Sequence, residues 1–264
     1  MASKSDGFRT YEKGEPIVRV RDLSKSFGSL RVLKDLTCDI LAGHTTVFLG
    51  PSGTGKSVFI KHIVGLLRPD AGELLVMERN VPVLNDRELY ALRKHLGLAF
   101  QLGALFDSLN VFDNVSFPLV HNTDMSRKEI KHRVGEVLEL VGLPGTEHKL
   151  TTELSTGEQK RVGLARALSM NPTIVLFDEP TTGLDPILCT TIDELILKLK
   201  TELGRTFIVI SHDIEGTWKM ADYVGVLYQG SLLRYGTNQE VHNDENIFLK
   251  QFFGRTENGP MVGV

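Results

Sequence analysis

The hydrophobic positions of this chain fall into short continuous runs that alternate with longer amphipathic segments. Residues 173–177 and 207–210 are uninterrupted apolar runs, typical of strands buried on both faces of a parallel sheet. Residues 45–49, which are β-branched and apolar, form a similar run. Helical patterns separate these runs, so the sequence predicts an α/β fold with a doubly wound parallel sheet.

Strands of a second kind are expected towards the ends of the chain. Residues 17–23 and 32–40 alternate along their length and predict an N-terminal antiparallel β subdomain, with a turn-rich loop at 24–28. Residues 224–227 and 232–235 predict a hairpin. A further strand is expected at 95–100.

Capping signals and apolar spacing predict the helices. Ser126 and Glu129 match a capping box, and one apolar helical face then continues as far as Gly142. Asp185 has N-cap chemistry for a helix that we expect to end at Gly204. Two further helices are expected, at 57–67 and 157–169.

A glycine-rich octet lies between the first parallel strand and a helix. It consists of Gly50, Pro51, Ser52, Gly53, Thr54, Gly55, Lys56 and Ser57. Glycines let successive backbone N–H groups point into one concavity that binds anions, and the helix N-terminus adds a partial positive charge. Lys56 can reach the β- and γ-phosphates, and the Ser57 hydroxyl can ligate Mg²⁺. A surface turn that happens to contain glycines is the alternative, but a strand before it and a helix after it favour a nucleotide site.

An acidic pair, Asp178 and Glu179, directly follows the apolar run at 173–177. Asp178 is placed to hold Mg²⁺, and Glu179 to polarise a water molecule that attacks the γ-phosphate. A solvated turn is the competing interpretation of such a pair. The phosphate loop earlier in the chain favours the functional one.

Composition narrows the class of protein. The formal net charge is −3 and the pI is near 6.3, so the chain lacks the excess of basic residues that indicates a nucleic-acid partner. The two cysteines suit a reducing compartment, and Cys38 is interpreted as a small buried residue on a strand. Residues 1–16 lack the apolar segment of a secretory signal, and no apolar stretch approaches the ~18 residues that span a bilayer. We expect a protein that does not cross a membrane by itself.

Four more elements accompany the phosphate loop and the acidic pair in a fixed order. They are Gln101 at a strand end, the run Leu154-Ser155-Thr156-Gly157-Glu158-Gln159, Leu184-Asp185, and His212 after the last long strand. In this order they resemble the ATP-binding cassette (ABC) ATPases over about residues 17–236. A lone strand-end Gln or His would be structural more often than not; the shared order carries the resemblance. It implies that residues 17–243 form an ATPase domain, namely an ABC nucleotide-binding domain built on a P-loop NTPase core. A helical insertion subdomain lies within this domain, at about 101–164. A polar tail at 1–16 precedes the ATPase domain, and a short tail at 244–264 follows it.

The resemblance also implies roles for individual residues. Gly50–Ser57 would cradle the phosphates of ATP, and Phe27 would stack on adenine, with a plain core Phe as the alternative. Gln101 would touch Mg²⁺ and sense a membrane partner, and His212 would contact the γ-phosphate. Asp185 would belong to the loop that links the two ATP sites of the family. Mg²⁺ would be held by Ser57, Gln101 and Asp178, and the catalytic residues would be Glu179, His212 and Gln101.

In this family, the segment of Ser155 and Gly157 binds ATP held by the opposite subunit, which implies a head-to-tail homodimer. The segment departs from the usual Leu-Ser-Gly-Gly-Gln, because Thr156 replaces a glycine and Glu158 the glutamine. Thr156 adds a β-branched side chain where the backbone must approach a phosphate closely. Slower hydrolysis or a looser ATP-bound dimer is therefore expected.

The stretch at 101–119 carries the most information about cargo. Its Gln-Leu-Gly-Ala-Leu-Phe and Asn-Val-x-Phe-Pro-Leu sequences are similar to those of the Mla/Mce-type lipid-transport ATPases of bacterial envelopes. Core packing of the helical insertion is the alternative use of its apolar residues. The resemblance implies an integral membrane permease, a lipid-binding Mce/Mla component, phospholipid cargo, no nucleic acid, and a place on the cytoplasmic face of the inner membrane. An importer of amino acids or other polar solutes, and a soluble ABC protein acting on DNA or the ribosome, are the alternatives.

The C-terminal segment is also rich in apolar residues. Its residues Ile247, Phe248, Leu249, Phe252 and Phe253 could pack on the core or on a second subunit.

Overall fold

A six-stranded sheet forms the centre of the molecule. Its strand order is β10-β9-β3-β8-β7-β6, in which β9, β3, β8, β7 and β6 run parallel and β10 pairs antiparallel with β9 at one edge. The strands are β3 (Thr45–Leu49), β6 (Leu96–Ala99), β7 (Ile174–Asp178), β8 (Thr206–Ser211), β9 (Tyr223–Tyr228) and β10 (Ser231–Thr237). The computed structural model describes residues 7–100 and 104–254 of the chain. The doubly wound α/β fold and the C-terminal hairpin are confirmed.

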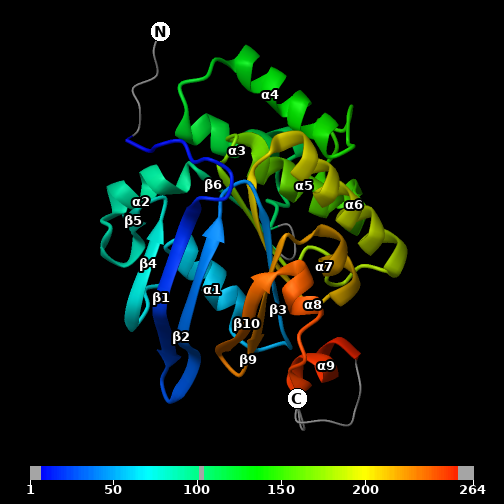
Figure 1. Cartoon of the computed structure of the whole chain (residues 1–264). Coiled ribbons are helices and arrows are strands. Elements are labelled where there is room, and N and C mark those ends of the chain that lie inside the picture. Colours follow the sequence, from blue (N-terminus) through cyan, green and yellow to red (C-terminus); the bar gives the residue numbers. More distant parts are fainter. Residues whose placement is uncertain (1–6, 101–103, 255–264) are drawn as a thin grey trace.

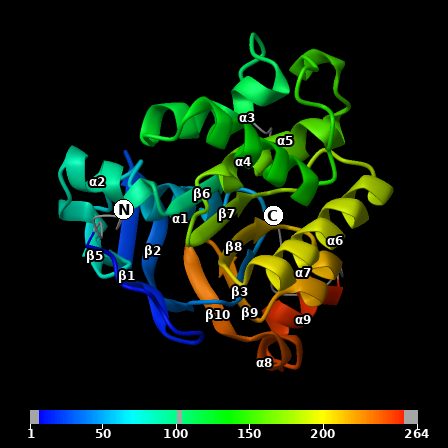
Figure 2. The same cartoon turned by 90° about the horizontal axis from the view of Figure 1, so that it is seen from above.

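Both faces of this sheet are buried, which explains the uninterrupted apolar runs. Successive residues of a strand point to opposite faces, so Val175 and Phe177 of β7 pack into one core and Ile174 and Leu176 into the other. Helices α3 to α7 cover the first face, and helix α1 with the second sheet covers the other (Figure 2). The strand ends are thereby held rigidly from two sides.

The second sheet is antiparallel, as predicted for the N-terminal part. Its order is β2-β1-β4-β5, with β1 (Pro16–Phe27), β2 (Leu30–Leu41), β4 (Ala71–Val76) and β5 (Arg79–Asn80). The loop predicted at 24–28 is wrong, because Lys25 pairs with Leu33 and Phe27 with Leu30, which extends β1 to Phe27. Cys38 is 5% exposed on β2, which confirms it as a buried strand residue.

The helices follow their capping signals closely. The Ser126–Glu129 capping box begins α4, and Asp185 caps α6, which ends at Gly204 in the left-handed conformation. The helix predicted at 57–67 is shorter, because the chain turns at Val64 and Gly65. The helices are α1 (Lys56–Ile63), α2 (Asp86–Arg93), α3 (Val111–Asn122), α4 (Arg127–Leu140), α5 (Thr156–Ser169), α6 (Pro186–Leu203), α7 (Ile214–Met220), α8 (Asn238–His242) and α9 (Ile247–Gly254), with 3₁₀ turns at Val81–Val83 and Thr151–Glu153.

Helices α3, α4 and α5 lie between β6 and β7 in the sequence and gather at one end of the molecule (Figure 1). The C-terminal helix α9 lies at the opposite end, near α8. Within the described residues, no helix has the length and apolar character that a membrane span requires.

Candidate active site

The phosphate loop connects β3 to α1, as the sequence predicts. Gly50 and Gly55 have positive φ angles of 154° and 99°. A Cβ on Gly50 would lie 2.2 Å from the carbonyl oxygen of Leu227, and one on Gly55 would lie 2.9 Å from that of Val32. Only glycine fits both positions, and this shapes the loop. No side chain caps the N-terminus of α1, so its N–H groups are available to an anion.

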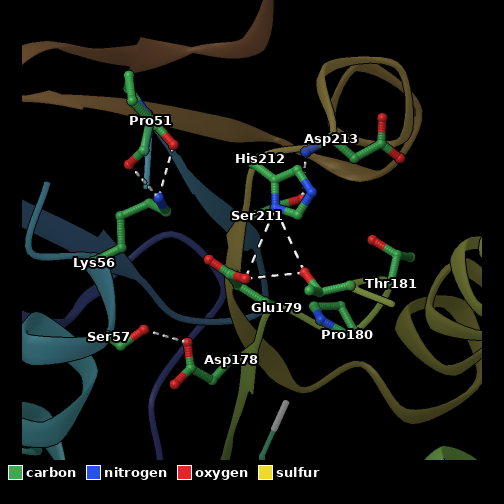
Figure 3. A network of polar contacts seen from close by, with 12 residues as sticks. Pro51, Lys56, Ser57, Asp178, Glu179, Pro180, Thr181, Ser211, His212 and Asp213 are labelled. Carbon is green, nitrogen blue, oxygen red and sulfur yellow. Dashed lines mark hydrogen bonds and ion pairs between the residues drawn. The ribbon is translucent and has the colours of Figure 1, made fainter. Parts of the chain in front are cut away.

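Lys56 lies inside this loop. Its side chain is 4% exposed, and its ammonium group donates hydrogen bonds to the carbonyl oxygens of Gly50 (2.7 Å) and Pro51 (2.8 Å) (Figure 3). Burial lowers the pKa of Lys56, because the charged form loses its hydration there. A buried ammonium beside free helix N–H groups is suited to the negative charge of a triphosphate.

Ser57 and Asp178 meet at the other side of the loop. The Ser57 hydroxyl donates a 2.8 Å hydrogen bond to Oδ1 of Asp178, which ends β7. Burial raises the pKa of Asp178, and the hydrogen bond from Ser57 works against that rise. A hydroxyl and a carboxylate at one point supply the oxygen ligands that Mg²⁺ prefers, so the two residues fit the predicted metal.

Glu179 follows directly and faces His212. Its Oε2 lies 3.8 Å from Nδ1 of His212 and accepts a 2.9 Å hydrogen bond from the Thr182 hydroxyl. Its backbone has a φ of 51°, an uncommon value for a residue with a side chain, and its N–H bonds to the carbonyl oxygen of Ile210. Glu179 is 16% exposed and His212 50%, so the pair lies at the mouth of the site.

Two residues of this group carry no sequence signal that we used. Thr182 also lies 3.5 Å from Nδ1 of His212. Lys160 of α5 donates hydrogen bonds to the carbonyl oxygens of Pro180 (2.8 Å) and Thr182 (2.7 Å), which fixes the turn after Glu179. Lys160 meets this turn only through tertiary packing, which no sequence pattern reveals.

The remaining predicted residues lie around this centre. Phe27 ends β1 and is 47% exposed, with the Lys25 ammonium 5.6 Å from its ring centroid, so the alternative of a core Phe is wrong. Asp185 is exposed and its Oδ1 accepts hydrogen bonds from the N–H groups of Ile187 and Leu188. Gln101 lies outside the described residues.

The segment around Ser155 is held by contacts of its own. Ser155 is the exposed N-cap of α5, Thr156 is exposed beside it, and Gly157 is buried against Leu188 of α6. Glu158 closes a capping box, in which its Oε2 accepts hydrogen bonds from the N–H and the hydroxyl of Ser155. These bonds lower the pKa of Glu158. The exposed hydroxyl therefore has a carboxylate for its neighbour.

A phosphate loop between strand and helix, with carboxylates at the end of a nearby parallel strand, defines a P-loop nucleoside triphosphatase. Residues 33–182 match the family model for the ABC transporter. The chain belongs to the ABC transporter ATPase family, and it is an ATPase whose hydrolysis is coupled to transport.

Relatives of known sequence cover nearly the whole chain. A "probable ribonucleotide transport ATP-binding protein mkl" of Mycobacterium leprae is 41% identical over 92% of this chain and 70% of its own length. The "intermembrane phospholipid transport system ATP-binding protein MlaF" of Escherichia coli is 35% identical over 93% of this chain and 91% of its own length.

Solved structures share the fold. The cbiO1 protein of Clostridium perfringens, part of the ABC transporter complex cbiONQ, has a TM-score of 0.80 and 32% identity, over 91% of this chain and 95% of that one. The ATP-binding cassette MJ0796, a dimer bound to ADP and Pi, has a TM-score of 0.76 and 32% identity, over 84% of this chain and 98% of that one. The predicted ABC nucleotide-binding fold is confirmed.

Proposed function

We propose that this chain is the ATP-hydrolysing subunit of a bacterial ABC transporter that moves phospholipid between membranes through a separate permease. The arrangement of Glu179, His212 and Thr182 beside the phosphate loop carries the enzymatic part of this proposal. The likeness to MlaF over most of both chains supports the cargo. The subunit would work at the cytoplasmic face of the inner membrane, with a lipid-binding Mce/Mla-type component in the same system.

The nucleotide would be held by Gly50, Pro51, Ser52, Gly53, Thr54, Gly55, Lys56 and Ser57, with adenine on Phe27. Mg²⁺ would be held by Ser57, Asp178 and Gln101, and it would neutralise charge on the phosphates. Glu179 takes a proton from the attacking water at its carboxylate. Thr182 orients that carboxylate, and His212, whose Nδ1 lies 3.8 Å from Oε2 of Glu179, would contact the terminal phosphate.

A second copy of the chain would complete each site. Ser155 and Gly157, with the capping residue Asp185 nearby on α6, would face ATP held by the partner subunit. The exposure of Ser155 and Asp185 supports this, because both side chains can be reached from outside the protomer. The dimeric structure of the cassette MJ0796 supports a pair of subunits.

The decisive experiment on the enzyme is Glu179→Gln. We expect turnover to fall about 100-fold or more, with ATP binding retained and an ATP-dependent dimer accumulating. Glu215→Gln, an exposed carboxylate on α7, is the control and should hydrolyse ATP normally. A Glu179→Gln variant that keeps most of its ATPase rate would remove Glu179 from the role of base.

An apolar groove supports docking of a permease. Phe106 and Phe117 line it with their ring centroids 4.8 Å apart, and they are 43% and 38% exposed. The buried Asn114 fixes the loop that presents Phe106, because its side chain bonds to both the N–H and the carbonyl oxygen of Phe106. Changing both rings to Ala should weaken capture of the permease and leave basal ATPase activity intact. Ile247→Ala, 63% exposed on α9, is the control.

The names of the mycobacterial relatives favour one alternative, a ribonucleotide or other polar solute as cargo. Phospholipid cargo and polar-solute cargo are distinguished by measuring the ATPase activity of the chain purified with its permease. Stimulation of ATPase activity by vesicles of phosphatidylethanolamine and phosphatidylglycerol supports lipid transport. Stimulation by ribonucleotides, with no response to vesicles, supports the alternative.

A further inference from the structure

A second acidic pair, Asp193 and Asp213, lies close to His212 in the fold and has no role in the site described above. Asp193 projects from α6, two turns beyond Asp185, and is 7% exposed. Asp213 caps α7 immediately after His212, and its Oδ1 accepts a hydrogen bond from the N–H of Glu215. Figure 3 shows Asp213 next to His212 on the same turn.

The two carboxyl groups converge on Gly216 of α7. A Cβ placed on Gly216 would lie 2.4 Å from Oδ2 of Asp193 and 2.7 Å from Oδ2 of Asp213. Both oxygens therefore occupy the space where a side chain of α7 would stand. The absence of a side chain at Gly216 allows α6 and α7 to approach closely through these two groups.

The surroundings of Asp193 are mostly acidic or neutral. Asp213 faces it from the cap of α7, and Lys219 of the same helix attracts it; Cys189 and Asp185 precede it on α6. From α5, Lys160 acts on Cys189. Burial, and next the charge of Asp213, raise the pKa of Asp193 to about 6, against the smaller opposite effect of Lys219. Like charges this close cannot both ionise without cost.

We propose that Asp193 is a positioning residue for ATP hydrolysis, because its neutral form lets the helix that Asp185 caps pack against the turn of His212 through the two carboxyl groups beside Gly216. Loss of the Asp193 proton leaves two negative charges around Gly216. Their repulsion pushes the cap of α7 away from α6 and displaces His212 from Glu179. The inference rests on the proposed role of His212 in hydrolysis.

Trp218 provides a direct test, since it is the one tryptophan of the sequence and lies in α7. Its ring contacts that of His242, centroids 4.7 Å apart, so the titration is done in a His242→Gln background. We expect Trp218 emission to change with an apparent pKa near 6, and Asp193→Asn to abolish that change. Asp213→Asn, which keeps N-cap chemistry, should abolish it as well. Identical titrations with and without Asp193 would overturn the proposal.

The ATPase pH profile is the second measurement. The wild-type kcat should fall ~2-fold or more as pH rises through 6, while Asp193→Asn should hold the low-pH rate throughout. Glu194→Gln, an exposed neighbour on α6, should keep the wild-type profile. If Asp193→Asn leaves the pH profile unchanged while His212→Ala abolishes activity, the inference about Asp193 is refuted and the proposed role of His212 stands. Wild-type turnover in His212→Ala would refute the proposed role of His212 instead.

Discussion

The carboxylate of Glu158 accepts a 2.7 Å hydrogen bond from the Ser155 hydroxyl and a 2.8 Å bond from the Ser155 N–H. Ser155 is thus engaged by an anion of its own helix at the position that we propose to face the ATP of the partner subunit. Lys149, 4.0 Å from Glu158, offsets that charge only weakly because the pair is partly exposed. The departure of Glu158 from the usual glutamine therefore has a direct electrostatic consequence.

Replacing Glu158 with Gln should tighten the ATP-bound dimer. The amide can keep the capping box while removing a negative charge that repels the γ-phosphate. We expect the KM for ATP to fall about 3- to 10-fold, and the dimer to form at lower protein concentration in a Glu179→Gln background. Dimerisation is measured by sedimentation of the Glu179→Gln variant, with and without Glu158→Gln, in the presence of ATP.

Glu129→Gln is a matched control for this change. Glu129 closes the same capping box on α4, with Ser126 in place of Ser155, and its pKa is likewise lowered by those bonds. It should alter neither KM nor dimerisation. Equal effects of the two substitutions would show that Glu158 acts through helix stability and not through charge at the nucleotide.

Thr182 should orient the proposed base. Its hydroxyl donates to Glu179 at 2.9 Å, so Thr182→Val removes a donor while keeping the shape of the side chain. We expect kcat to fall about 10-fold, which corresponds to about 1.4 kcal/mol, with little change in KM. Thr182→Ser should restore the rate. Thr201→Val, an exposed position whose hydroxyl donates a hydrogen bond to the carbonyl oxygen of Leu197 within α6, is the control. A raised KM with normal kcat would contradict this role.

The sequence predicts the features whose cause is local. The capping box of Ser126 and the left-handed stop at Gly204 depend on neighbours a few residues away, and both appear in the structure. The extension of β1 to Phe27 depends on pairing with β2, which no local pattern reveals. Lys160 and Asp193 gain their surroundings only from tertiary packing, so spacing in the sequence gives no reason to select them.

Asp193 should also make stability depend on pH. Its pKa of about 6 in the folded chain lies above the ordinary value near 3.8, so the folded state binds the proton more tightly than the unfolded state. Stability from this group is complete below pH 4 and is lost as pH rises through 6. The loss is on the order of 2–3 kcal/mol by linkage.

Asp193→Asn should therefore be more stable than wild type at pH 8, and the difference should shrink at pH 5. Urea unfolding at the two pH values measures it, with Glu194→Gln as the control. If Asp193→Asn were destabilised equally at both pH values, the carboxyl would be an ordinary packing group.

The C-terminal helix should stabilise its own protomer. Leu249 is fully buried, and Phe253 contacts the edge of Trp218 with centroids 4.8 Å apart, which favours packing on the core over a role between subunits. Changing Phe252 and Phe253 together to Ala should lower the free energy of unfolding by about 2–4 kcal/mol, since both rings are partly buried. Thermal unfolding measures this loss. Ile247→Ala on the exposed face of the same helix should have little effect. An unchanged melting temperature with a weakened ATP-dependent dimer would instead place α9 at the subunit interface.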